Sequence, residues 1–526
     1  MTDDAEKAEL DRDPAIWREG LDIQLGLADD EAFLRMVWGL NALQTGRADV
    51  GRPYFRNAPP EAAKDGIGGK HSVYPWELET LVNELLVTPK HAHGPLFDCR
   101  DWSAIATLVN ELRGLENAEY GQRRAERSIL RELGRIGARQ FEWQRGFFSI
   151  QQLYRSAYIY GQKACNDHLV ATTGLTMPVL TLVGFALMSS YLGSSAIQPG
   201  SDLALLESLG ASRDELEKAI ALISRPLPDL RTEARQIRSD GELTAYKASV
   251  LRRFPCVLVG RGNSQMLAPL PELVSNRLTS GLFYDVIGGG GPVRDETGRQ
   301  FESYSYALLN AMLPEFQFER EWAYQTRLGQ MKSPDIMLAL PDQTIGLAIE
   351  CKALRMTVAA RFGDEPQDER GYEEIVRGIF QLWRFFAHCR LGLAGRDVTD
   401  EARGVILTLD DWFAARHSIL EQLLKRAHAR ADEEKVPILP IDRRPIAFCA
   451  ISEIEQTLRT ATGASLLATI ELAAGEKLGW IFPMVHQDLK APKTEPKDFP
   501  FENEVGDLLP WYRRIGEMAD DGTFAD

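Results

Sequence analysis

Two carboxylates and an amine occur close together in the segment SPDIMLALPDQTIGLAIECKAL, which spans residues 333 to 354. Asp335 precedes one apolar run, and Glu350 and Lys352 end the next. The runs IMLAL and IGLAI predict two paired strands, joined by a turn at PDQT. Carboxylates in a buried hairpin need a compensating partner, because burying an unpaired charge is costly.

The turn sets which residues face each other. With Asp342 and Gln343 as its two central residues, antiparallel pairing places Asp335 opposite Glu350. Facing residues have Cβ atoms about 4.5–5.5 Å apart, where like charges are destabilising. A divalent cation would remove that repulsion, and carboxylate oxygens suit Mg²⁺ or Mn²⁺. Lys352 lies two positions after Glu350 and therefore on the same face of the strand.

Neighbouring segments must position this hairpin. Residues 294–316 predict a helix with Glu302 at the border of its apolar face, and 315–324 alternate as a half-buried strand would. Residues 371–390 predict a second helix, which carries a polar face as well as an apolar one. That polar face comprises Arg377, Gln381, Arg384 and His388. Further strands are expected within 403–414 and 444–452.

These residues resemble a known family. SPD, fourteen intervening residues and ECK are similar to the signature of the PD-(D/E)xK nuclease superfamily, and the resemblance covers about 290 to 460. It implies an α/β restriction-endonuclease-like domain, a central mixed sheet flanked by helices. Gln381 resembles the helical glutamine of exonuclease-like branches, whereas Phe385 stands where those branches often carry a tyrosine.

The resemblance implies a metal site and its chemistry. Asp335, Glu350 and the backbone carbonyl of Cys351 would hold Mg²⁺ or Mn²⁺, which would bind a scissile phosphate and lower the pKa of an attacking water. Glu302 would hold a second metal, directly or through water. The thiol of Cys351 is expected to pack rather than to act as a nucleophile.

Other side chains would serve the substrate. The resemblance implies that Lys352 orients or activates the attacking water and offsets phosphate charge, and that Gln381 and Arg384 position the nucleic-acid backbone. Arg377, on the same helical face, would be a further nucleic-acid contact. An exposed helix residue remains the alternative for Glu302, and a simple polar-face residue for Gln381.

A second candidate nucleic-acid surface precedes this region. Arginines recur every four residues and would form a stripe on one helical face. They are Arg127, Arg131, Arg135 and Arg139. The alternative is a solvated face partly neutralised by Glu126 and Glu132. The net charge of -16 excludes a uniformly basic coat, so any nucleic-acid site must be local.

The cysteine spacing and the N-terminal residues indicate in which cellular compartment the protein is expected. The six cysteines are scattered without a CxxC pair, and the acidic N-terminus does not resemble an export leader, so we expect a cytoplasmic protein. Residues 169–197 carry no charge and could cross a bilayer by length. Their Ser and Thr content favours a buried core helix instead, with Thr176 as N-cap and Pro178 in the first turn. No membrane association is expected.

The chain divides into four regions by pattern. We expect a mostly helical recognition or regulatory region over 1–240, a small α/β connector over 241–291, the nuclease domain over 292–475 and a helical tail over 476–526. The connector ends in GGGGP, which lacks the GK[ST] of a phosphate loop and favours a flexible joint.

The function expected is a metal-dependent nuclease, most simply a DNA endonuclease. By analogy alone, such an enzyme would suit bacterial defence against phage or plasmids. The alternatives are an RNA-cleaving nuclease of the same fold and a non-enzymatic nucleic-acid-binding or scaffold protein with a degenerate nuclease fold. The expected partner is nucleic acid, DNA before RNA; a second copy of the chain or a partner protein of a defence system are further options.

Overall fold

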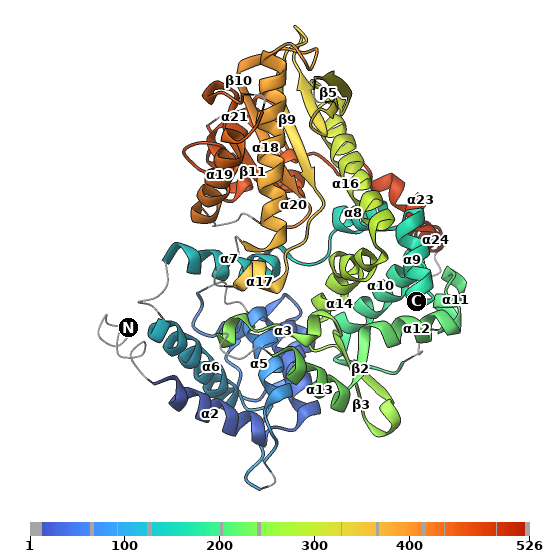
Figure 1. Cartoon of the computed structure of the whole chain (residues 1–526). Coiled ribbons are helices and arrows are strands. Elements are labelled where there is room, and N and C mark those ends of the chain that lie inside the picture. Colours follow the sequence, from blue (N-terminus) through green and yellow to red (C-terminus); the bar gives the residue numbers. More distant parts are fainter. Residues whose placement is uncertain are drawn as a thin grey trace.

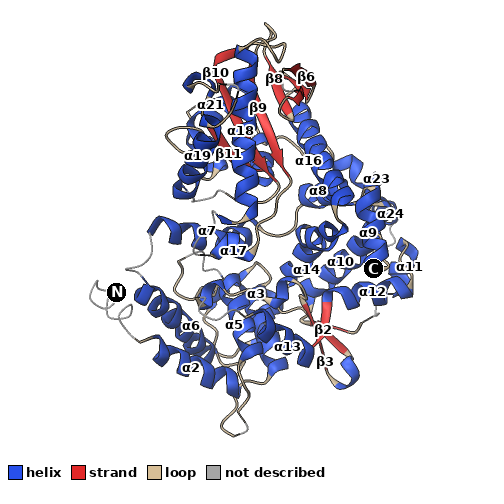
Figure 2. Ribbon diagram, viewed as in Figure 1, coloured by secondary structure: helices blue, strands red, loops and turns tan. Residues whose placement is uncertain are grey.

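The computed structural model describes residues 13–520, except 64–67, 92, 124–128, 200–202, 239–242, 328, 364–367, 413–416, 436 and 491. The fold is mixed α/β, and helices predominate (Figure 2). A five-stranded sheet with its covering helices forms the upper part in Figure 1, and a mainly helical assembly forms the lower part. The predicted helical character of residues 1–240 is confirmed for the described part of this region, where only two short strands interrupt the helices.

The helices before the main sheet follow one another along two stretches of the chain. The first stretch contains α2 (Pro14–Leu27), α3 (Asp30–Gln44), α4 (Ala48–Gly51), α5 (Pro75–Val87), α6 (Trp102–Arg123) and α7 (Ile129–Arg145). The second stretch contains α8 (Ile150–Tyr160), α9 (Lys163–Thr173), α10 (Met177–Gly193), α11 (Leu203–Leu209), α12 (Arg213–Ile223), α13 (Leu227–Ile237), α14 (Pro271–Leu278) and α15 (Phe283–Val286), of which α13 packs back against α5. A small sheet of order β1-β4-β3-β2 lies among them. Its strands are β1 (Ala196–Ile197), β2 (Ser224–Pro226), β3 (Cys256–Val259) and β4 (Gln265–Leu267).

The main sheet has the strand order β11-β10-β9-β8-β5. Its strands are β5 (Gln317–Arg320), β8 (Ile336–Ala339), β9 (Ile345–Lys352), β10 (Val398–Thr408) and β11 (Ile446–Ala450). β5, β8 and β9 pair antiparallel, whereas β9, β10 and β11 run parallel. The sheet is therefore mixed, as predicted.

The predicted register is confirmed at the acidic end of the hairpin but not at its turn. Ile336 pairs with Ile349, so the preceding Asp335 comes opposite Glu350. A register shift follows Leu338, and the N–H of Leu340 donates to the carbonyl of Thr344 at 2.9 Å. The bulge adds a residue to the turn, which Gln343 closes at a φ of 67°. The predicted two-residue turn is thus wrong.

The strand predicted over 315–324 is two strands. β5 ends at Arg320, and β6 (Ala323–Thr326) pairs with β7 (Gly329–Lys332) in a separate two-stranded sheet. Glu321 and Trp322 separate the two strands and pair with neither sheet. The inserted hairpin β6–β7 returns the chain to β8, beside the predicted site.

Helices cover both faces of the main sheet. α16 (Gly291–Met312) packs on one face through Phe301, Tyr304 and Leu308, as the helical spacing predicts. α18 (Arg370–Arg390) covers the other together with α19 (His417–Asp432). Figure 1 shows α18 lying along β9. The short α17 (Val358–Phe362) leads from β9 towards α18.

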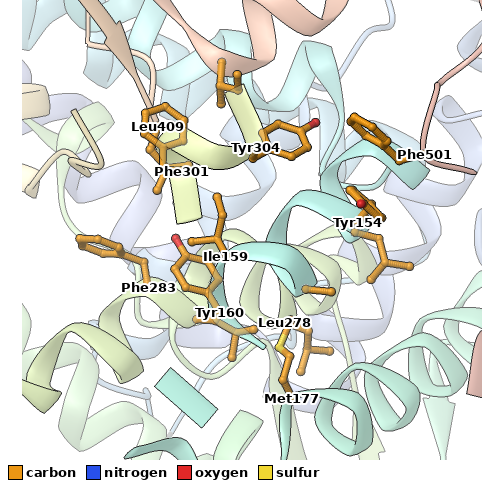
Figure 3. Packing of buried hydrophobic residues seen from close by; sticks show 14 of the residues in the cluster. Tyr154, Ile159, Tyr160, Met177, Leu278, Phe283, Phe301, Tyr304, Leu409 and Phe501 are labelled. Carbon is orange, nitrogen blue, oxygen red and sulfur yellow. The ribbon is translucent and has the colours of Figure 1, made fainter. Parts of the chain in front are cut away.

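One core joins the sheet to the rest of the chain. Tyr154 of α8 stacks on Phe501, and both lie near Tyr304 of α16 (Figure 3). The indole of Trp511 donates to the hydroxyl of Thr181 on α10 at 3.1 Å. Predicted boundaries near 291 and 476 therefore cross a continuous hydrophobic cluster. The closing helices are α20 (Ile451–Leu458), α21 (Gly463–Ala473), α22 (Phe482–Asp488), α23 (Val505–Leu508) and α24 (Pro510–Asp520).

The apolar segment after 169 forms the predicted core helix. Thr176 caps α10 by accepting from the N–H of Val179, and Pro178 lies in the first turn. Within the described ranges no single helix is long and apolar enough to span a bilayer; α9 and α10 together reach that length and composition but bend by 67° at their break.

The glycine run is a tight turn, which corrects the predicted flexible joint. Gly290 adopts a φ of 81° and caps the N-terminus of α16. A Cβ on Gly289 would approach Cγ of His168 to 2.8 Å. The glycines are needed because the backbone turns sharply against α9.

Candidate active site

Four of the predicted residues meet where β8 begins and β9 ends. The carboxylate of Asp335 accepts the N–H of Cys351 at 2.7 Å. The ammonium of Lys352 donates to Glu350 at 2.8 Å and to the side-chain oxygen of Gln381 at 3.1 Å. Glu350 is only 4% exposed. The hairpin and α18 together therefore hold two carboxyl groups, an amine and an amide in one cluster.

Gly378 allows α18 to lie this close to the hairpin. It precedes Gln381 by one helical turn, and a Cβ there would lie 3.0 Å from Cε of Lys352 and 3.4 Å from Cγ of Glu350. A larger residue would meet both catalytic candidates. Gly378 was not among the predicted site residues, although its position three residues before Gln381 places it on the same face of the helix.

Repulsion between carboxylates governs the electrostatics. Burial, followed by the charges of Glu350 and Glu302, raises the pKa of Asp335 well above its usual value. Burial also raises the pKa of Glu302, with added repulsion from Glu321 and Glu350. Glu302 of α16 thus faces the same cluster, as predicted, although the predicted metal role stays untested. The site carries more negative charge than its own cations offset.

Two lysines compensate part of that negative charge. Burial alone would lower the pKa of Lys352, but the contact with Glu350 raises it above its usual value. Lys332, at the end of β7, pairs with Glu321 at 2.7 Å and lies in the field of Glu302 and Asp335. Lys332 and Glu321 were not among the predicted site residues, because a single strand over residues 315–324 leaves no place for the β6–β7 hairpin that brings them together.

The donor set suits Mg²⁺ or Mn²⁺ by chemistry. Asp335 and Glu350 supply oxygen ligands from facing positions, and their mutual repulsion is what a divalent cation would relieve. Among the described residues, however, no three His, Cys, Asp or Glu side chains are grouped closely enough to hold a metal ion together. In the protein alone, Glu350 forms an ion pair with the ammonium of Lys352 instead. The carbonyl of Cys351 stays a predicted ligand.

The thiol of Cys351 is not poised for attack. Its side chain is 6% exposed, and burial, followed by the charge of Asp335, raises its pKa well above the usual value. A protonated, buried thiol is a poor nucleophile. The structure therefore agrees with the packing role expected for Cys351.

The predicted substrate arginines on α18 lie in different environments. Arg377 is exposed and pairs with Glu374 at 2.9 Å. Arg384 is half-buried, and its guanidinium lies 5.3 Å from the ring centre of Phe380. Arg377 is therefore the more accessible of the two to a polyanion.

The arginine stripe before α8 is wrong for the two members whose side chains are described. Arg135 is 3% exposed and contacts Glu132 and the carbonyl of Gly363. Arg139 pairs with Glu116 at 2.7 Å. Amphipathic spacing alone could not show that this face packs inward. Arg127 and the side chain of Arg131 lie outside the described residues.

Comparisons with known proteins add no relative. No protein-family model, no curated protein and no solved structure matches this chain.

Proposed function

We propose that the chain is a metal-dependent nuclease of the PD-(D/E)xK type that cleaves DNA endonucleolytically. The observation that carries the proposal is the cluster of Asp335, Glu350 and Lys352 with Gln381. The order of elements supports it: α16 with Glu302, then β5, β8, β9 and α18 around a mixed sheet. The resemblance in sequence and the placement of its residues thus agree.

The residues divide the work of phosphodiester hydrolysis. A divalent ion, when bound by Asp335 and Glu350, would supply Lewis-acid activation of water and of the phosphate. Lys352 would donate from its ammonium to a phosphate oxygen or to the attacking water, and so offset negative charge that grows during the reaction. Gln381, already 3.1 Å from that ammonium, would hold it in position.

Lys352 and the cation would share one carboxylate. The ammonium donates to Glu350 at 2.8 Å in the protein alone. A cation that takes oxygen from Glu350 would compete with this ion pair and free the amine for substrate. Because Asp335 has a raised pKa, it would also release a proton when it ligates metal. Cation affinity should therefore increase with pH.

The test compares wild type with Asp335→Asn and with Asp342→Asn. Asp342 is an exposed aspartate of the same hairpin, at its turn, and serves as the matched control. Each protein is incubated with supercoiled plasmid, linear duplex, single-stranded DNA and RNA, in Mg²⁺, Mn²⁺ or EDTA. We expect nicking of plasmid by wild type and the control, and none by Asp335→Asn or in EDTA.

Other outcomes separate the alternatives. Cleavage of RNA alone would support metal-dependent phosphodiester hydrolysis but would make RNA, not DNA, the substrate. Cleavage that survives in Asp335→Asn or in EDTA would remove the metal mechanism. If nothing is cut, calorimetry with Mn²⁺ decides: binding lost in Asp335→Asn indicates a nuclease awaiting an activator, and equal binding indicates a scaffold. The defence role remains an analogy to be tested by phage challenge.

A further inference from the structure

Two adjoining cavities separate the sheet from the helical region. Their volumes are about 440 and 540 Å³, and both are lined by Arg355, Arg361, Glu142 and Met356. The walls come from α7, from the segment that follows β9 and from residues just after β10. Figure 1 shows α7 and α17 between the upper and lower parts. Because they share lining residues, the two cavities lie next to each other and form one region of the molecule.

This space has the opposite charge to the chain as a whole. Ten arginine and lysine side chains line it against six aspartates and glutamates, in a protein of net charge -16. Several of the arginines already have acidic partners: Arg252 pairs with Glu79 at 2.6 Å and with Glu142 at 2.7 Å. Within the lining itself cations still outnumber acids, although some pair with acids outside it: Arg139 with Glu116 at 2.7 Å, and Lys247 with Glu84 at 3.7 Å. An anion would add to this compensation where the lining is short of acids.

Arg355 has donor capacity to spare. Its side chain is 10% exposed, and its nearest acid, Asp410, lies at 3.7 Å. Its Nε has no hydrogen-bond partner within the described residues. Buried guanidinium donors normally have partners. The Nε is itself shielded from solvent, but the Arg355 side chain lines both cavities, so its guanidinium is placed to donate to a ligand there. A phosphate would accept from it in the geometry that arginine favours.

Aromatic side chains line the same space. Tyr284 is 57% exposed, and its hydroxyl donates to the carbonyl of Met356 at 2.9 Å, which fixes the ring at the cavity wall. Phe362 lines the same part of the cavity and stacks on Tyr246 with ring centres 5.2 Å apart. Arginines for phosphate and a ring for a base are the usual parts of a nucleotide site.

We propose that this cavity is a binding site for a small nucleotide, separate from the acidic cluster on β8 and β9. Arg355 would contact the phosphates, and Tyr284 would stack on the base. The volume lies within the range of small-molecule sites. A long nucleic acid is the less suitable occupant, because Arg155 and Arg355 are almost fully buried.

If the nuclease proposal holds, a ligand bound in this cavity would affect strand β9, which carries Glu350 and Lys352. Arg355 follows Lys352 by three residues, and the N–H of Leu354 donates back to the carbonyl of Lys352 at 2.7 Å. The N–H of Met356 donates to Asp410 at 3.1 Å. A ligand that engages Arg355 would therefore act on the segment that ends at Lys352. This consequence rests on the proposed function, whereas binding itself does not.

Calorimetry on the full chain tests the site without using cleavage. The probes are ATP, inorganic pyrophosphate and a short single-stranded DNA. We expect one ATP per chain and weaker binding of pyrophosphate. Arg355→Gln should weaken both by about tenfold or more, the size of one charge-assisted contact. Tyr284→Ala should weaken ATP only. Asp335→Asn should bind ATP as wild type does, which separates this test from the nuclease test.

Two further variants keep the test informative if Arg355→Gln fails to fold. Arg459→Gln changes an exposed cavity residue, and Arg213→Gln changes an exposed arginine of α12 outside both cavities. Weakening by Arg459→Gln with none by Arg213→Gln would support the site. Equal effects of the two, no heat with ATP and pyrophosphate, or binding of DNA alone that Arg355→Gln or Arg459→Gln removes would each overturn it.

Discussion

The acidic cluster and the arginine-lined cavity are close in sequence and opposite in charge. Lys352 belongs to the first, and Arg355, three residues later, belongs to the second. In the cluster, one ammonium and the neighbouring Lys332 face several carboxylates. In the cavity, arginines outnumber acids. One short segment thus passes from a site that should attract a cation to one that should attract an anion.

The difference shows how each region tolerates buried charge. In the cluster Lys352 pairs with Glu350, and in the cavity Arg252 pairs with Glu79. Each region therefore reduces the desolvation penalty of its buried charges by ion pairing. What remains unbalanced is a carboxyl with a raised pKa in one region and an unpaired guanidinium nitrogen in the other. Changing single members of each region therefore tests the two kinds of imbalance separately.

The largest expected effect is on cleavage. Lys352→Ala should lower the rate by about a thousandfold, because in the proposed mechanism this amine offsets the charge of the reacting phosphate. Lys425→Ala, an exposed lysine on α19, is the matched control and should cleave as wild type does. Plasmid nicking under single-turnover conditions measures both. A Lys352→Ala rate within threefold of wild type would mean that the amine serves folding only.

Glu453 tests how far the positive excess of the cavity reaches. Burial and the charge of Asp411 raise its pKa to about 7, although Arg145 of the cavity wall lies 3.9 Å away. A group whose pKa is raised by folding contributes stability at low pH, which is lost as pH increases through the folded value. Wild type should therefore lose stability between pH 5 and pH 8.

Glu453→Gln should flatten that decline by about 2 kcal/mol, since a neutral amide does not titrate. Urea unfolding at several pH values gives the slope. Glu476→Gln, an exposed position, should leave the wild-type slope unchanged. An unchanged slope in Glu453→Gln would show that the cavity arginines hold Glu453 ionised, and would strengthen the positive field inferred there.

Gly378 tests the packing of the cluster rather than its charge. Gly378→Ala should reduce cleavage by about tenfold, because the added Cβ would lie 3.0 Å from Cε of Lys352 and displace it. Gly516→Ala on α24, where a Cβ meets nothing within 4 Å, is the control. Thermal unfolding should distinguish a displaced amine from a destabilised helix. Full activity in Gly378→Ala would show that Lys352 tolerates movement.

The sequence predicted the local parts of the cluster well. Period-two alternation and the spacing of Asp335 and Glu350 were enough to place the two acids opposite each other. Helical spacing placed Gln381 on the side of α18 that reaches Lys352. Such features depend on residues near each other in the chain, and their periodicity survives whatever packs around them.

Features that depend on distant packing were not predictable in the same way. Arg135 and Arg139 follow a regular stripe, yet each also has a partner on another part of the fold, Gly363 and Glu116 respectively, and so the stripe faces inward. The cavity is assembled from segments far apart in sequence, and no short motif marks it. The glycine run has the composition of a linker, but contact with His168 orders it.

The smallest expected effect concerns the stability of the acidic cluster. Repulsion from Glu350 and Glu302 adds to burial in raising the pKa of Asp335, so stability that this group contributes at low pH is lost as pH increases through its folded pKa. Asp335→Asn should remove that loss and raise the free energy of unfolding at pH 7.5 by about 1 kcal/mol, a typical gain when a functional site is neutralised. The gain should shrink at pH 5, whereas Asp342→Asn, in the exposed turn, should show none. Added Mg²⁺ should also narrow the difference at pH 7.5, because only wild type keeps the full pair of carboxylates for the cation. A gain in the free energy of unfolding that is independent of both pH and Mg²⁺ would mean that the amide merely packs better than the carboxylate. It would also mean that the acidic cluster does not bind a cation, and the contrast with the anion-binding cavity would then fail.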